Sequence, residues 1–398
     1  MPCNISRRAA VLLICVLGIL LPPVAGPETA QARPTLDQVI SEAVQAMGGE
    51  DNIHNLQSLV FRGFHYEGSY KEEFAGSRTG KSVMTRMRPN LRVVGCRPEI
   101  EGCEGKWGGI VEGFDGEKGW ELNWPKQRLI FAVNKAERAL KCGAAFDPWF
   151  VDYKQRGYRA AYLGEQTLLG TLGIAVSVTR DDCQQTTTYY FDPATHILLM
   201  QRATLPVHAR GDAVDTVEVM RETTLVNGVR IPSRVEEINL QTGDVLGGAE
   251  WTSIVANSVT DAKIFEAPEV HPQGITAVVL KMLSASQHDA STAQMMEIYK
   301  EYRRTAGKNE DVSYDMNWLA YELLKVDKYG QAETVFRQII AENPNSARAY
   351  ENLAELYLQK NDSAQAKEAL QHAIALGSTD PDSKKKLERL NEQQQRIK

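Results

Sequence analysis

The chain has 398 residues, and its 45 lysines and arginines against 51 aspartates and glutamates give a formal net charge of −6. A mildly acidic chain without a basic block lacks the electrostatic footprint of a nucleic-acid-binding protein, so we expect no nucleic-acid partner. The length exceeds the roughly 100–200 residues of one typical domain and predicts two domains.

The first 32 residues have the order of a secretory signal peptide. Arg7 and Arg8 precede an apolar run from Ala9 to Leu21, and small residues then lead to Ala32. The run is shorter than the about 20 apolar residues that span a bilayer, so we expect cleavage after Ala32, or alternatively after Gly26. The mature chain would be periplasmic or extracellular, with peripheral or no membrane contact. It would carry 43 basic and 50 acidic side chains.

Four cysteines remain in the mature chain, and none of them forms a C-x-x-C pair. In an oxidising compartment they predict two disulfides. Cys96 and Cys103 flank the short, turn-rich segment RPEIEG, which favours their pairing and leaves Cys142 with Cys183. The other two pairings and free buried thiols stay open.

An amphipathic helix is predicted from Thr35 to Met47, and it ends at Gly48 and Gly49. Beyond it the apolar period changes to two, and Gly, Pro and Asp turns separate the alternating segments, which predicts an antiparallel sheet. A helical interruption at 135–142 and 148–155 divides the strands into two sets. The expected strands are 59–66, 82–87, 91–94, 107–114, 119–123 and 128–133, followed by 158–164, 173–180, 186–192, 198–205, 214–226, 229–240 and 249–256.

Past Gly274 helical patterns replace strands, and the tail matches itself at a spacing of 34 residues. Small residues at Ala320 and Ala332 would let two helices approach closely. The matched apolar pairs are Met316 with Tyr350, Leu319 with Leu353, Ala320 with Ala354, Leu323 with Tyr357, Ala332 with Ala366, Phe336 with Leu370 and Ile339 with Ala373. This spacing and its alternation of bulky and small positions are those of tetratricopeptide repeats.

Two such repeats, 313–346 and 347–380, cannot bury a stable core without neighbours. A degenerate helix pair after Gly274 and a polar capping helix near the C-terminus supply them. We therefore predict a sheet domain at 33–272 and a repeat domain at 274–398, an α+β chain overall.

The segment AGSRTGKS at 75–82 fits the loose form of a phosphate-binding loop. Such a loop needs an apolar strand before it and a helix directly after it. Here charged residues precede it, and Pro89 prevents a helix of useful length. We interpret the segment as a turn between two strands.

No catalytic, cofactor or metal motif is apparent, so we predict a protein that is not an enzyme. Neither G-x-S-x-G nor D-[ST]-G occurs, and adjacent carboxylates such as Asp181 and Asp182 would point to opposite faces of a strand. The histidines show no ligand spacing and are expected at surface and turn positions. They are His54, His65, His196, His208, His271, His288 and His372.

Aromatic residues gather around the segment FDGEKGW and the helical interruption: Trp120, Trp124, Phe131, Trp149 and Phe150. Ordinary packing of a sheet on a helix explains them most simply. The alternative hypothesis is an apolar pocket between a curved sheet and a helical lid.

The region from Thr35 to Val270 resembles the LolA-like family, which includes carriers for outer-membrane lipoprotein sorting and the stress regulator RseB. The resemblance rests on the helix ending AMGG, on RPNLRV and FDGEKGW, on the helical interruption, and on TYYFDPATHILL and VNGVRIPSRVEE. It implies a curved antiparallel half-barrel whose apolar concave face is covered by helices and holds acyl chains. The cysteines and the long sheet depart from a minimal carrier.

The tail resembles tetratricopeptide proteins, which implies that it binds a protein or peptide in a groove. The groove-facing positions would be Asn317 and Tyr321 in one repeat and Glu351 and Glu355 in the next. These residues replace the Lys and Asn residues of members that clamp acidic C-termini, so an acidic peptide is not the expected ligand.

Three functions follow, in order of preference. The first is an exported, non-enzymatic envelope protein whose half-barrel binds a lipid or lipidated protein while the repeats dock a partner. The second is a pure assembly scaffold with a solid half-barrel. The third, an exported hydrolase, has only scattered carboxylates in its favour.

Overall fold

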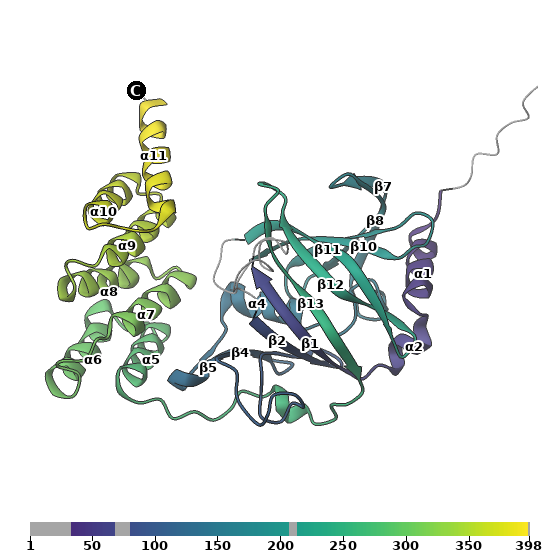
Figure 1. Ribbon diagram of the computed structural model, residues 1–398, viewed down its shortest axis with the longest axis horizontal. Helices are drawn as coiled ribbons and strands as arrows, with labels where there is room; N and C mark the ends of the chain where they lie inside the picture. The colour runs from purple at the N-terminus through teal and green to yellow at the C-terminus, as the bar shows by residue number, and fades with distance from the viewer. Residues whose placement is uncertain (1–32, 68–79, 207–212, 397–398) are drawn as a thin grey trace, which may run out of the picture. The chain divides into compact units, whose positions relative to one another are not determined.

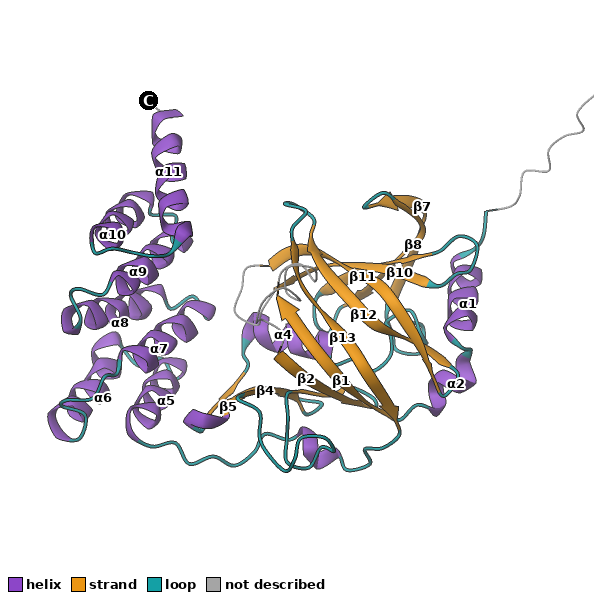
Figure 2. Ribbon diagram, in the orientation of Figure 1, coloured by secondary structure: helices purple, strands orange, loops and turns teal. Residues whose placement is uncertain are grey.

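The structure is a computed structural model that describes residues 33–67, 80–206 and 213–396. It has an α+β fold, in which a curved, unclosed antiparallel sheet of thirteen strands precedes a helical region (Figures 1 and 2). The signal-peptide prediction, residues 1–32, lies outside the described residues. Among the residues that are described, no helix has both the length and the hydropathy needed to cross a bilayer.

Each of the thirteen expected strands overlaps an observed one. The strands are β1 (Ser58–Glu67), β2 (Gly80–Met87), β3 (Leu91–Val94), β4 (Ile110–Phe114), β5 (Gly119–Asn123), β6 (Arg128–Phe131), β7 (Arg159–Leu168), β8 (Thr171–Arg180), β9 (Gln185–Phe191), β10 (Leu198–Pro206), β11 (Ala213–Val226), β12 (Val229–Asn239) and β13 (Val245–Ala256).

The sheet consists of two meanders joined at its centre. Its order is β6-β5-β4-β3-β2-β1-β13-β12-β11-β10-β9-β8-β7, so every strand except β1 and β13 pairs only with neighbours in sequence. At the centre β1 pairs with β13, with Leu59 opposite Ala256. The edges of the sheet are therefore β6 and β7.

Both faces of the sheet are covered near its centre. Successive side chains of a strand point to opposite sides, so β1 contributes to both covered faces. On one side Leu59 and Phe61 of β1 pack with α1 (Leu36–Met47), α2 (Glu50–Asn55) and residues 144–157; we call this the helix-covered face. On the other side Val60 packs with the 96–107 loop and with the 3-10 helix η2 (Ala262–Phe265); we call this the loop-covered face.

The structure differs from the predicted helical interruption in residues 144–157, which we call the cover segment. α4 (Asn134–Gly143) confirms the first part of the expected helical interruption, but 148–155 forms consecutive turns instead of a helix. Asp152 has a left-handed backbone with φ of 53°, and Gly157 has φ of 71°. Such conformations end a right-handed helix, so the apolar residues of this segment pack without helical periodicity.

Both predicted disulfides are present. Cys96 is bonded to Cys103 within the loop of the loop-covered face. Cys142 of α4 is bonded to Cys183, which lies between β8 and β9. The second bond thereby ties α4 to the sheet.

The helical region contains seven helices among the described residues: α5 (Gly274–Gln287), α6 (Thr292–Thr305), α7 (Ser313–Lys325), α8 (Tyr329–Glu342), α9 (Ala347–Gln359), α10 (Ser363–Ala375) and α11 (Pro381–Arg396). Side-chain caps define several starts. Ser291 and Gln294 form a capping box at α6, and the Asp362 side chain accepts from the backbone amide of Gln365 at α10.

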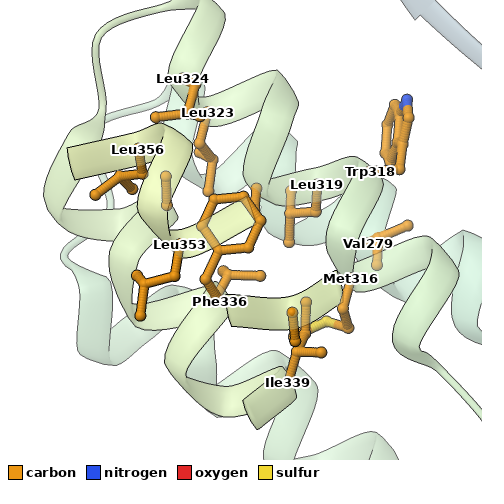
Figure 3. Close-up of a cluster of buried hydrophobic side chains, with 14 of the residues drawn as sticks. Val279, Met316, Trp318, Leu319, Leu323, Leu324, Phe336, Ile339, Leu353 and Leu356 are labelled. Carbon is orange, nitrogen blue, oxygen red and sulfur yellow. The ribbon is translucent and has the colours of Figure 1, made fainter. Parts of the chain in front are cut away.

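The repeat positions build the core of this region. Leu319 of α7, Phe336 of α8 and Leu353 of α9 belong to one buried cluster, in which the ring of Phe336 lies among leucines (Figure 3). Ala320 and Ala332 are fully buried, as expected where two helices approach closely. The starts of α7 and α9, Ser313 and Ala347, are 34 residues apart, which is the period found in the sequence.

Candidate functional site

A groove of about 710 Å³, here called the repeat groove, lies among α7, α9, α10 and the segment leading into α11. Side chains four residues apart on α9 share one face of that helix and line its wall. The lining residues are Tyr321, Ser346, Ala347, Arg348, Glu351, Asn352, Ala354, Glu355, Leu370, Gly377, Ser378, Thr379, Asp380, Ser383 and Lys386. The groove is thus mostly polar.

A ladder of hydrogen bonds joins α7 to α9 at the repeat groove. Asn352 donates from Nδ2 to Asn317 Oδ1 at 2.7 Å. The Tyr321 hydroxyl lies 2.9 Å from both Asn352 Oδ1 and Glu355 Oε2. The Tyr321 ring packs edge-on against Phe336, with 5.6 Å between the ring centroids. The ring is therefore anchored in the core while its hydroxyl faces the groove.

Burial and hydrogen bonds together determine the protonation states of Tyr321 and Asp380 in the repeat groove. Burial, and secondly the Glu355 carboxylate, raise the pKa of the Tyr321 hydroxyl, which keeps it a neutral donor. The pKa of Asp380 is lowered, chiefly because the backbone amide of Asp382 donates to its carboxylate. Glu351 accepts from the Ser378 hydroxyl. The groove therefore offers carboxylate acceptors beside polar donors.

Of the four positions that the sequence analysis proposes as groove-facing, Tyr321, Glu351 and Glu355 lie in the lining of the repeat groove. Asn317 supports the lining through Asn352. The sequence analysis missed Asn352, Arg348 and the residues near α11. Asn352 and Arg348 share a helix face with Glu355 and Glu351, a signal that could have found them.

The five aromatic residues of the pocket hypothesis lie in different places. Trp120 is fully buried under the loop-covered face, where its indole nitrogen donates to the Phe265 carbonyl at 2.8 Å. Trp124 lies on the same side and stacks on Trp107, with ring centroids 5.1 Å apart. Phe131 pairs with Trp120 in register but lies on edge strand β6 and is 49% exposed.

Trp149 and Phe150 belong instead to the cover segment on the helix-covered face. Phe150 packs edge-on against Tyr189 and Phe191, with centroids 5.0 and 5.2 Å away, and the Trp149 backbone amide donates to the Tyr189 hydroxyl. The structure therefore does not gather the five aromatic residues around one cavity.

Two half-buried charged residues also lie on the helix-covered face. Arg86 of β2 donates to the Ala145 carbonyl of the cover segment, and burial lowers its pKa to about 10. Glu218 of β11 accepts from Gln201, and burial raises its pKa. This face combines aromatic packing with a polar patch.

The segment AGSRTGKS is partly outside the described residues, which resume at Gly80. Lys81 and Ser82 lie on β2, with Lys81 opposite Phe64 of β1. A strand therefore stands where a phosphate loop requires a helix.

Comparisons with known proteins cover both regions. The tetratricopeptide repeat family matches residues 323–390. A search of curated proteins found no match.

Solved structures similar to this chain include a DUF1329 family protein from Desulfovibrio piger, with a TM-score of 0.39, 10% identity, and coverage of 58% of this chain and 96% of that one. A LolA superfamily protein from Nitrosomonas europaea has a TM-score of 0.39 and 11% identity, covering 59% and 99%. PcrH in complex with the chaperone binding region of PopB has a TM-score of 0.20 and 16% identity, covering 29% and 91%. The similar structures thus include the LolA superfamily, and the helical region contains a tetratricopeptide repeat.

Proposed function

We propose that the mature chain is an exported, non-enzymatic adaptor that docks an extended peptide segment of a protein partner in the repeat groove. The observation that carries the proposal is the set of hydrogen bonds that joins α7 to α9 at a groove of about 710 Å³. Asn352 uses one of its two N–H donors on Asn317 and one of its two oxygen lone pairs on Tyr321, so one donor and one acceptor remain, the combination that a peptide backbone requires. The two disulfides support export to an oxidising compartment.

The charges of the groove favour a partner segment with basic side chains. Three carboxylates, Glu351, Glu355 and Asp380, face two cations, Arg348 and Lys386. Charge-assisted hydrogen bonds to such carboxylates are about twice as strong as neutral ones. A lysine or arginine of the partner would therefore be selected near Glu355.

A peptide-display selection on the immobilised mature protein tests this function. We expect enrichment of peptides with basic residues on the unmodified protein and loss of that enrichment in Glu355→Lys. Glu368→Lys, an exposed position on α10 outside the groove lining, is the matched control and should keep it. Equal enrichment on all three proteins would contradict the proposal.

A second candidate function, binding of a lipid or lipidated protein by the sheet region, is favoured by one row of side chains on β8. Val178, Val176 and Ile174 point to the helix-covered face and are buried, and Leu172, next in the same alternation, is 48% exposed near the hairpin turn. The apolar row therefore continues from the core out to solvent, where an acyl chain could first make contact.

Titration with a fluorescent fatty acid tests the second function. Leu172→Asp should weaken binding of the probe, whereas Leu376→Asp, at an exposed leucine of the helical region, should not. If the unmodified protein fails to bind the probe, the sheet region is a solid scaffold.

A further inference from the structure

We propose that Glu50, His54 and Asp152 form a binding site for a divalent transition metal, with zinc as the best fit. One ligand atom from each of the three residues lies within 4.8 Å of the others. His54 Nε2 is 2.6 Å from Asp152 Oδ2. In tetrahedral zinc sites with bonds of 2.0–2.1 Å, neighbouring ligand atoms lie about 3.3 Å apart, so small side-chain rotations would admit the ion.

The two elements that carry these ligands are held in place independently of any metal. Glu50 and His54 are four residues apart on α2 and share one face of it, while Ile53 of the same helix is buried in the core. On the other side, Asp152 follows Val151, which is also buried. The ligand side chains therefore project from anchored backbone.

A second contact fixes α2 to the cover segment. The Arg88 guanidinium donates to the carbonyls of Ile53 and Leu56 at 2.7 and 2.6 Å, and also binds the Asp147 carboxylate. The distance between α2 and the cover segment is thus set by a neighbouring network. This arrangement reduces the ordering that metal binding would otherwise require.

The chemistry of the site selects the kind of metal. One imidazole nitrogen and two carboxylates suit zinc and similar ions, and the two carboxylates balance a charge of +2. Calcium needs six to eight oxygen ligands, more than these side chains supply. His54 and Asp152 are 43% and 24% exposed, so water can complete the coordination. A bound ion would join α2 to the cover segment of the helix-covered face.

The sequence carried one signal for this site, the spacing Glu50-x-x-x-His54. However, the helix α2 that carries both residues was not predicted. Asp152 lies almost a hundred residues further along the chain. The sequence analysis compared the spacing of the histidines and did not pair His54 with a carboxylate. Its partner could be found only from the fold.

Isothermal titration of tag-free mature protein with zinc chloride tests the site. We expect one zinc ion per chain, with affinity reduced roughly 100-fold or more in His54→Ala and in Asp152→Asn, because even supporting residues of a metal site contribute 10–100-fold. Two controls should bind as the unmodified protein does. Asp51→Asn removes a neighbouring carboxylate of α2, and His196→Asn removes a histidine that pairs with Glu42 at 3.5 Å.

Hydrogen exchange in the same samples separates a specific site from loss of structure. Zinc should slow amide exchange in α2 and in the cover segment of the unmodified protein but not of His54→Ala, while exchange without zinc stays equal in the two proteins. Absence of zinc binding, equal weakening in Asp51→Asn, or tighter binding of calcium than of zinc would overturn the proposal.

Discussion

Arg88 and Asp147 form a two-point ion pair that joins β2's end to the cover segment: Nη2 lies 2.9 Å from Oδ1, and Nη1 binds Oδ2. Their side chains are 22% and 11% exposed. The Arg88 guanidinium also lies 4.8 Å from the centre of the Phe146 ring. One arginine therefore organises α2, β2 and the cover segment together.

Removal of this pair should destabilise the sheet region. Asp147→Ala is expected to lower the free energy of unfolding by about 3 kcal/mol, because it leaves a largely buried cation uncompensated. Urea unfolding monitored by circular dichroism measures the change. Asp181→Ala breaks the exposed pair with Arg159 and should change the unfolding free energy little. Similar effects of the two substitutions would contradict this interpretation.

The two disulfides should contribute unequally. Cys142 and Cys183 are 41 residues apart, whereas Cys96 and Cys103 are 7 apart. In the chain-entropy description the longer loop contributes about 4 kcal/mol and the shorter about 2 kcal/mol. Double serine variants of each pair, compared by thermal unfolding, should therefore show the larger loss for the pair 142–183. The reverse order would rule out loop closure as the main effect.

Burial raises the pKa of Glu218, with the nearby Glu237 charge adding to the rise and the Gln201 hydrogen bond opposing it. The folded chain then keeps a proton that the unfolded chain has lost. Glu218 therefore adds to the free energy of unfolding. This contribution is complete below the ordinary pKa of glutamate and is lost as pH rises through the folded-state pKa. Glu218→Gln lacks this titration. The unfolding free energy of the unmodified protein should therefore fall relative to the variant as pH rises above 4.5, the ordinary pKa of a glutamate.

Urea titrations of both proteins at several pH values in that range check this expectation. A difference that stays constant, or that moves in favour of the unmodified protein as pH rises, would show that Glu218 is ionised in the fold.

The Tyr321 hydroxyl connects two residues of the repeat groove. Tyr321→Phe keeps the ring against Phe336 but removes the hydrogen bond to Asn352 and Glu355. We expect a stability loss of about 1 kcal/mol and weaker binding of the peptides selected on the unmodified protein. Fluorescence anisotropy with one such peptide measures the second effect. Unchanged affinity would place the peptide away from the ladder.

Local patterns predicted much of this fold. A period of two located the strands, and the 34-residue spacing relates Tyr321 of α7 to Glu355 of α9, both of which line the repeat groove. Long-range relations were not predictable in the same way. The contributions of Ser383 and Lys386 depend on where α11 packs, which no repeat period encodes.

The aromatic pocket shows the same limit. Trp120 and Trp149 occur near each other in sequence, but Trp120 belongs to the loop-covered face and Trp149 to the helix-covered face. Residues 148–155 were predicted as a helix, whereas they form turns with Asp152 in a left-handed conformation. Backbone conformation at a single residue outweighed the local pattern.

The pairing of β1 with β13 has a consequence for how the chain acquires its shape. Leu59 pairs with Ala256, which lies 197 positions later in the sequence. The middle of the sheet therefore cannot assemble until nearly all of the strands have been synthesised. Contacts this distant slow folding, because a long loop must close before they form. Until β13 has been made, β1 therefore pairs with β2 alone and keeps its other edge without a strand partner.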